Sequence, residues 1–266
     1  MTDRVLPSAG SISGYIYQDT IGNGLSSGDV AMGGIYVELY RYENLGFFGS
    51  GYLLDGLQKS ASNGSYSFGS LAAGQYAVTE ATPWGAVQTA PSTFDYEVKL
   101  ASGQQVTGEN FANFEVPNTS TVTNISFTVT SPNGSTTTVR NLQGHTQQGD
   151  TVTANFTIAP HSAPVTLSLI SYNATGPHNN PATEDEDTVL EVATGTFGSG
   201  QSSLSVQLPK NFYELDFVVG SAINEFGPTG SNINYNAQGR LLSSDSGGKN
   251  ALQLGNVSGT VVDSTS

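Results

Sequence analysis

Cysteine is absent from the 266 residues, and positive charge is scarce. The absence of Cys excludes disulfides, thiolate metal sites and a cysteine nucleophile. Only 8 Lys and Arg stand against 22 Asp and Glu, and the resulting net charge of -14 repels nucleic acid and anionic membranes. No apolar run approaches the roughly 18 residues that a membrane span needs, and "MTDRVLPSAG" lacks the regions of a signal peptide. We therefore expect neither nucleic-acid binding nor membrane insertion.

Helical periodicity and enzyme motifs are also missing. No window keeps an apolar period of 3.6 residues over several turns. The Gly-x-Ser-x-Gly, phosphate-loop and His-Glu-x-x-His motifs do not occur. The chain instead holds 32 Gly, 11 Pro, 12 Tyr and 12 Phe, a composition typical of short strands joined by tight turns. The sequence predicts an all-β protein that is not an enzyme.

Alternating patterns divide the chain into two expected β-sandwiches. In the first, residues 11–116, "GGIYVELYRY" places Val37 and Leu39 on one face and Tyr36 and Tyr40 on the other. "SNGSYSFGSLAAGQYAVTEATPWG" opens with a pair suited to a hairpin turn, and "GQQVTGENFANFEV" closes the unit. Residues 1–10 precede it as an extension.

The second sandwich is expected over residues 117–249, after the polar joint "VPNTST". Its strands are predicted at regular spacing, and residues 250–266 are left as a tail or an exchanged strand. The expected strands are "VTNISFTVTS", "TVTANFTIA", "VTLSLISYNA", "TVLEVATGTF", "SSLSVQLP" and "YELDFVVGSAI".

Four segments of the first unit resemble the SdrD B-like modules, relatives of the collagen-adhesin (Cna) B-type domains of bacterial surface proteins. They are "SGYIYQDTIGNG", "GGIYVELY", "NGSYSFGSLAAGQYAVTEATPWG" and "GENFANF". The resemblance implies a prealbumin-like sandwich that serves as a stalk, spacer or adhesive module outside the cell. The segment 211–242 of the second unit is similar to one found beside such modules in large exported bacterial proteins, and an Ig-like or jelly-roll-like sandwich is expected there.

The resemblance also implies a calcium loop after the first strand. Asp19, Asn23 and Asp29 fit the family pattern, with Gly24 at the bend and the Leu25 carbonyl available. Two ligand positions are lost, because Ile21 and Ser27 replace an oxygen ligand and a carboxylate. The loop is therefore either a calcium site or a cation-free hairpin loop.

Many relatives cross-link a Lys to an Asn with the help of a buried carboxyl group, which burial keeps neutral. Glu80 occupies the place of that acid, and Asn110 or Asn113 that of the amide. The first strand, "SISGYIYQD", holds no Lys. We therefore expect no cross-link, and expect Glu80 to bond backbone groups at the rim of the sandwich.

Three other features of the sequence are candidate sites. The acidic run "TEDEDT", residues 183–188, is either a solvated loop or a calcium site of the second sandwich. His145, His161 and His178 lack metal-ligand spacing and are expected at the surface. The seven Asn-x-Ser/Thr sequons are weak evidence for a glycoprotein, because a chain rich in Asn, Ser and Thr produces them by chance. They begin at Asn63, Asn118, Asn124, Asn133, Asn155, Asn173 and Asn256.

The leading functional hypothesis is an extracellular or cell-surface structural protein. It would be a surface module or a filament subunit that joins copies of itself by β-strand addition, or that meets other surface proteins. Two segments could supply the added strand, Val5–Ile16 and Val257–Val262. The alternative is an adhesin or carbohydrate-binding module, in which Trp84, Tyr36 and Tyr40 form an aromatic platform for glycans.

Overall fold

The chain is an all-β protein, which confirms the expected fold class. The computed structural model describes residues 8–176 and 186–249. Ten strands build the first unit, with one short 3₁₀-helix, η1 (Gly46–Phe48). The strands are β1 (Gly10–Asp19), β2 (Val30–Ala31), β3 (Tyr36–Asn44), β4 (Ser50–Lys59), β5 (Ser65–Leu71), β6 (Gly74–Glu80), β7 (Ala86–Ala90), β8 (Asp95–Leu100), β9 (Gln105–Thr107) and β10 (Phe111–Glu115).

The described part of the second unit follows a 3₁₀-helix, η2 (Thr119–Thr121), which Asn118 caps through its side chain. Its strands are β11 (Val122–Thr130), β12 (Thr136–Val139), β13 (Thr151–Ile158), β14 (Val165–Asn173), β15 (Thr188–Phe197), β16 (Gly200–Gln207), β17 (Tyr213–Val219) and β18 (Leu241–Gly247). Within residues 8–176 and 186–249, no strand pairs between the two units. The exact domain limits stay a prediction.

Two sheets face each other in the first unit. One has the order β4-β3-β6-β8, and the other is centred on β1, which pairs with β2, β5, β9 and β10. Alternation explains the core, because Val37 and Leu39 of β3 point inward and are almost fully buried, as expected. They meet Ile12 and Ile16 of β1 and Phe111 of β10 in one apolar cluster.

The second unit repeats this two-layer plan with the sheets β12-β11-β13-β16 and β15-β14-β17-β18. The core between them contains Phe127, Phe156 and Phe217. Every residue of β17 is buried, so this strand is covered on both faces. On its outer face Val218 packs with Phe226 and Tyr235, which belong to the long connection between β17 and β18.

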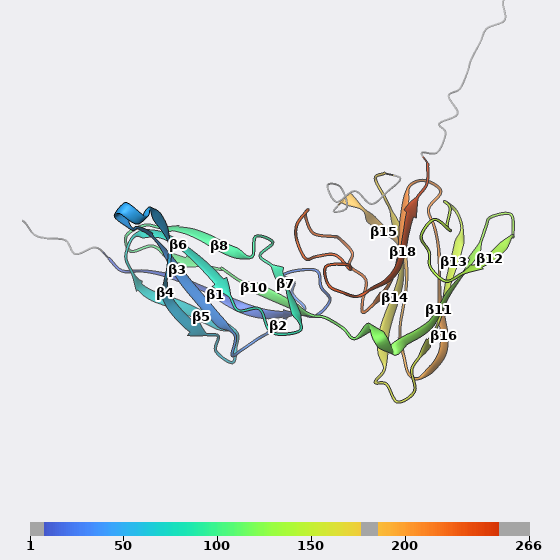
Figure 1. Ribbon diagram of the computed structural model, residues 1–266, viewed down its shortest axis with the longest axis horizontal. Helices are drawn as coiled ribbons and strands as arrows, with labels where there is room; N and C mark the ends of the chain where they lie inside the picture. The colour runs from blue at the N-terminus through green and yellow to red at the C-terminus, as the bar shows by residue number, and fades with distance from the viewer. Residues whose placement is uncertain (1–7, 177–185, 250–266) are drawn as a thin grey trace, which may run out of the picture.

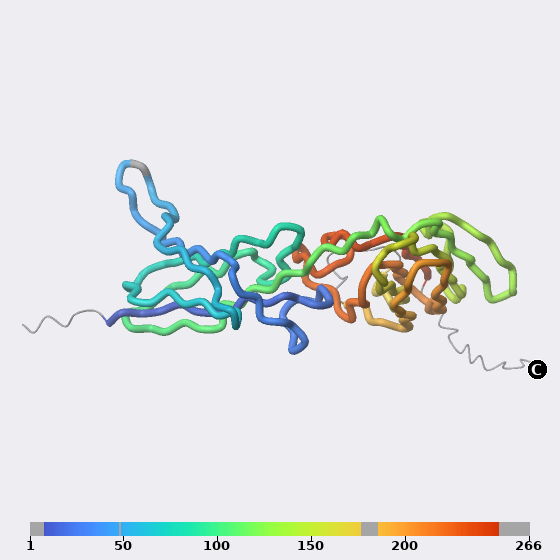
Figure 2. The backbone as a smooth tube through the Cα atoms, turned by 90° about the horizontal axis from the view of Figure 1, so that it is seen from below, coloured from blue at the N-terminus to red at the C-terminus, as the bar shows by residue number. Residues whose placement is uncertain are grey.

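The two units lie one after the other along the long axis of an elongated molecule (Figure 1). The described chain begins at the outer end of the first unit and ends on the second (Figures 1 and 2). The connection between β17 and β18 and the loop between β1 and β2 meet at the junction, where the side chains of Gln238 and Arg240 bond the backbone of Gly22 and Ile21.

Strands β3 and β4 form a hairpin whose tip stands out from the body of the first unit, in light blue in Figure 2. The sequence patterns did not predict β4, because its side chains are mostly exposed and show no apolar alternation. A β-bulge interrupts its pairing: Leu39 faces Gly56 and Tyr40 faces Leu54, so Asp55 is the extra residue.

The structure corrects one expectation about the chain ends. Residues 10–16 of the expected exchanged strand Val5–Ile16 belong to β1, which is paired on both sides inside its own unit. They are therefore not available to a neighbour. The other expected strand, Val257–Val262, lies outside the described residues. No helix in the described ranges is both long and apolar enough to cross a membrane.

Candidate functional site

The loop between β1 and β2 is organised around the carboxylate of Asp19, which is 1% exposed. Its Oδ1 accepts hydrogen bonds from the backbone N–H groups of Ile21, Gly22 and Asn23, at 2.7 to 3.3 Å. Its Oδ2 accepts from the Gly24 N–H and the Thr89 hydroxyl, both at 2.8 Å. The ring of N–H donors neutralises the carboxylate in the way an anion-binding backbone nest does.

The other expected ligands are arranged differently. Asp29 Oδ2 accepts from the Ser26 N–H at 2.7 Å, and Oδ1 accepts from the Ser26 hydroxyl at 3.1 Å. Leu25 is exposed. Asn23 Oδ1 is buried and accepts no hydrogen bond from the described residues. Asp19 and Asn23 thus come together, while Asp29 closes a separate turn with Ser26.

The second unit holds this loop through two side chains of the connection between β17 and β18. Gln238 Nε2 donates to the Gly22 carbonyl at 2.5 Å, and Arg240 Nη2 donates to the Ile21 carbonyl at 2.9 Å. A Cβ on Gly22 would lie 2.2 Å from Gln238 Oε1, and Gly22 has a φ of +82°. Only glycine fits there, because both the space and the backbone angle reject a side chain.

Arg240 is fully buried at the junction, with 0% exposure. Its guanidinium carbon lies 4.9 Å from the centre of the Phe114 ring in the first unit and 4.7 Å from that of Tyr235 in the second. Nη1 donates to the Ser221 carbonyl at 3.0 Å, whereas Nε has no partner. Burial lowers the pKa of Arg240, and the charge of Asp19 opposes that shift. Arg240 therefore places a positive charge beside the acidic loop, and its guanidinium lies between two aromatic rings.

Sequence reasoning missed Gln238 and Arg240, although both lie inside the segment 211–242 that was singled out. Their partners are far away along the chain, so no local pattern reports the contact. The available signal was composition: Arg240 is one of only 8 Lys and Arg residues, and Tyr235 lies shortly before it. In a chain with few positive charges, an Arg close to aromatic residues in the sequence is a candidate for a buried cation–π contact.

Glu80 and Asn113 form the expected acid and amide pair inside the first sandwich. Asn113 Nδ2 donates to Glu80 Oε2 at 3.0 Å, so Glu80 bonds a side chain and not the backbone groups that were expected. Burial raises the pKa of Glu80 to about 7, although the bond from Asn113 opposes this. Glu80 Oε1 and Asn113 Oδ1 are both buried without a partner. A protonated Glu80 could donate to Asn113 Oδ1 and satisfy both groups. Asn110 instead accepts from the Tyr15 N–H.

The acidic run of the second unit is described only in part, since residues 183–185 lie outside the described ranges. Asp187 is 6% exposed and accepts from the Thr175 N–H at 3.1 Å, so it is not a solvated residue. Among the described residues, no group of three His, Asp or Glu side chains is placed to hold a metal ion. His145 and His161 are exposed, as expected, and His178 lies outside the described residues.

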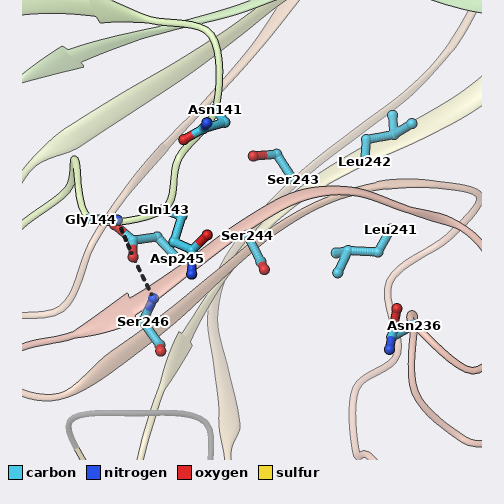
Figure 3. Close-up of a pocket in the computed structure, with 10 residues that line it drawn as sticks. All are labelled: Asn141, Gln143, Gly144, Asn236, Leu241, Leu242, Ser243, Ser244, Asp245 and Ser246. Atoms are coloured by element: carbon cyan, nitrogen blue, oxygen red, sulfur yellow. Dashed lines mark hydrogen bonds between the residues drawn. The ribbon is translucent and has the colours of Figure 1, made fainter.

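A groove of about 670 Å³ runs along β18, an edge strand of its sheet (Figure 3). Its lining is mainly polar and includes Asn141, Gln143, Asn236 and Ser244. Asp245 accepts from the Gly144 N–H at 3.0 Å, which fastens the adjoining loop to the strand. This groove is an alternative place for an added strand.

The three residues of the expected aromatic platform have different surroundings. Trp84 lies in the connection between β6 and β7 and is fully exposed, so it is not a packing residue. Tyr36 is exposed at the start of β3, and the Lys59 ammonium lies over its ring, 4.4 Å from the ring centre. Tyr40 donates its hydroxyl to Glu38. Within residues 8–176 and 186–249, the Trp84 ring is in ring contact with neither tyrosine.

No protein-family model and no curated protein matches this sequence. Among solved structures, the chain is similar to the minor pilin GBS52 of Streptococcus agalactiae, with a TM-score of 0.31 and 16% identity over 43% of this chain and 48% of the pilin. It is also similar to the major pilin SpaD of Corynebacterium diphtheriae, with a TM-score of 0.28 and 14% identity over 82% of this chain and 64% of the pilin. A third similar structure is that of BcpA, the major pilin subunit of Bacillus cereus. Its TM-score is 0.28, with 12% identity over 80% of this chain and 64% of the pilin.

The chain thus spans about half to two thirds of the length of these pilins. With TM-scores near 0.3 and identities of 16% or less, these likenesses carry no argument about what this chain does. The resemblance to the SdrD B-like family stays a prediction.

Proposed function

We propose that the chain is a non-enzymatic structural protein that works outside the cell as a filament subunit. Copies would join by β-strand addition, in which an extended segment pairs with an open sheet edge of the next copy. The observation that carries the proposal is the concentration of exposed apolar side chains on one hairpin with an open edge, β3–β4. A monomeric soluble protein seldom leaves such a surface uncovered.

The junction supports a mechanical role. Arg240 is buried between rings of both units and bonds the backbone of both. Asn232 adds a further contact, because its Nδ2 donates to the Gln88 carbonyl at 2.8 Å. Directional bonds at a buried junction resist bending of one unit against the other, which a load-bearing subunit needs.

Sedimentation velocity on the full chain and on a chain that ends at Lys249 tests this proposal. The shorter chain keeps every described strand. We expect the full chain to form species larger than a monomer as its concentration rises, and the shorter chain to stay monomeric. Equal sedimentation of the two chains would remove the strand-addition mechanism.

Glycan binding is a second candidate, favoured by the complete exposure of Trp84. An indole ring without packing partners offers its face to a sugar ring at low cost. Binding to a glycan array that Trp84→Ala abolishes, and that Phe94→Ala leaves unchanged, would support it. Phe94 is also exposed, which makes it a matched control.

A further inference from the structure

The β3–β4 hairpin carries a group of exposed apolar side chains. Its members, which we call the hairpin patch, are Tyr42, Leu45, Phe47, Leu53, Leu54 and Leu57. Phe47 is 99% exposed and Leu54 58%. These six residues lie within 16 positions of one another in the chain, from 42 to 57, and exposed apolar clusters of this kind mark interaction sites.

The hairpin patch lies on an open sheet edge. Strand β4 is the end strand of the order β4-β3-β6-β8, and no other described strand pairs with its free side. Pairing with β3 is regular over Ser50–Leu54, is interrupted by the bulge at Asp55 and resumes over Gly56–Lys59. Five residues of strand measure about 17 Å. The edge thus offers unpaired backbone groups over the length of one short added strand.

One face of this edge is lined with apolar groups, and the other carries Leu53. Tyr52 and Leu54 stand opposite Tyr42 and Tyr40 on one face, and the rings of Tyr42 and Tyr52 are in edge contact at 5.2 Å. Leu53 stands opposite Arg41 on the other face. A strand added here would find apolar neighbours for its alternate side chains on the face of Tyr52 and Leu54.

The segment of this chain that best fits the edge is Val257–Val262. It contains three valines, and Asp263 is the single ionisable side chain between residues 250 and 266. On a molecule with a net charge of -14, an almost uncharged tail is a part that can approach another copy with little repulsion. Residues 250–256 can span about 25 Å when extended, which lets the strand reach beyond its own unit.

The positions of the two elements favour contact between copies. The hairpin projects from the outer part of the first unit, while the described chain ends on the second unit (Figures 1 and 2). A tail that pairs with the hairpin of the next copy makes a head-to-tail contact. Such a contact is heterologous and continues from copy to copy unless the rotation closes a ring.

The groove along β18 fits this role less well. It follows the strand from which the tail departs, so a tail from a second copy would bring the same strands of both copies together and favour a closed dimer. Its lining is also mainly polar.

From these observations we infer that the free edge of β4, with the hairpin patch, is the acceptor for Val257–Val262 of a second copy. The inference rests on the proposed function and identifies the surface through which one copy would contact the next. The tail strand adds to the sheet β4-β3-β6-β8. Val257 and Val261, which share one face of an extended strand, pack beside Tyr52 and Leu54, and Val262 lies on the opposite face beside Leu53.

Leu54→Asp in the full chain tests the inference, with Leu190→Asp as the control. Leu190 is exposed to a similar degree and lies on β15, which is also an edge strand. We expect Leu54→Asp to abolish assembly in sedimentation velocity and Leu190→Asp to leave it unchanged. Both side chains are exposed, so both variants should keep the melting temperature of the parent protein within a few degrees.

A peptide-binding measurement tests the hairpin as acceptor independently of the assembly of the full chain. A fluorescent peptide of residues 250–266 is titrated with the chain that ends at Lys249, and anisotropy is recorded. We expect Leu54→Asp to weaken binding at least about tenfold and Leu190→Asp to have no effect. Peptide binding or assembly that survives Leu54→Asp overturns the hairpin as acceptor and leaves the filament proposal standing. A full chain that stays monomeric while the peptide binds the hairpin overturns the filament proposal alone.

Discussion

Glu80 is the residue whose charge state should be visible in the stability of the protein. Its pKa is raised by burial from 4.5 to about 7, so between these values the folded state binds more protons than the unfolded state. Stability therefore falls as the pH rises from 4.5 to about 7 and then levels off. The neutral acid is the form that can satisfy Asn113.

Glu80→Gln should remove this pH dependence. The amide stays neutral and can donate to Asn113 Oδ1. We therefore expect the difference in the free energy of unfolding, variant minus parent, to be about 1–3 kcal/mol larger at pH 8 than at pH 4.5. Urea unfolding at the two pH values measures the difference. Glu97→Gln, at an exposed position on β8, serves as the control. Equal pH profiles for the parent and Glu80→Gln would show that Glu80 is charged in the folded state at neutral pH.

The Asp19 loop should not need a cation. The two oxygens of Asp19 already accept five hydrogen bonds, and Arg240 brings a positive charge to the same loop. We therefore expect the melting temperature to be equal in calcium and in chelator, since a ligand of the folded state alone would raise it. If calcium raises it by several degrees and Asn23→Ala removes the effect, the loop is the calcium site that the family resemblance implies.

Between elements, Arg240 is expected to be the strongest single contact of the junction. Arg240→Met keeps the apolar stem between Phe114 and Tyr235 but leaves the carbonyls of Ile21 and Ser221 without their donors. We expect a loss of about 2–4 kcal/mol in the free energy of unfolding, together with a larger radius of gyration in X-ray scattering as the units separate.

Arg41→Met is the matched control. Arg41 forms an ion pair with Glu43 at 3.2 Å on the hairpin, where both side chains are more than one third exposed. Such pairs contribute about 0–1 kcal/mol. An Arg240→Met variant as stable and as compact as Arg41→Met would show that the junction does not depend on the buried guanidinium.

Alternation in the sequence was enough to predict the strands that bury one face. β15 begins and ends where the pattern "TVLEVATGTF" does, and β11 and β13 lie within their predicted segments. β17 also lies within its predicted segment, although it is buried on both faces. β4 and β18 were missed for physical reasons: β4 is exposed on both faces and bulged, and "LLSSDSG" of β18 holds few apolar residues. The family resemblance pointed to Glu80 and to Asn110 or Asn113 as candidates, but the bond of Glu80 with the Asn113 side chain replaces the backbone bonds that were expected. The contacts of Arg240 could not be predicted, because they join positions more than 100 residues apart, 240 to 114 and 21.

At the scale of the whole molecule, the features point in one direction. Two sandwiches are joined by a buried junction, the net charge is strongly negative, and six exposed apolar side chains lie on one projecting hairpin. A stiff, acidic body stays dispersed through repulsion except where a specific contact is made. The hairpin edge of one copy and the uncharged tail of the next would supply that contact.

Negative-stain electron microscopy of the purified full chain at increasing concentration tests this account most directly. The account predicts unbranched filaments with one chain per axial repeat, which Leu54→Asp prevents. A uniform field of single two-lobed particles at every concentration would contradict it.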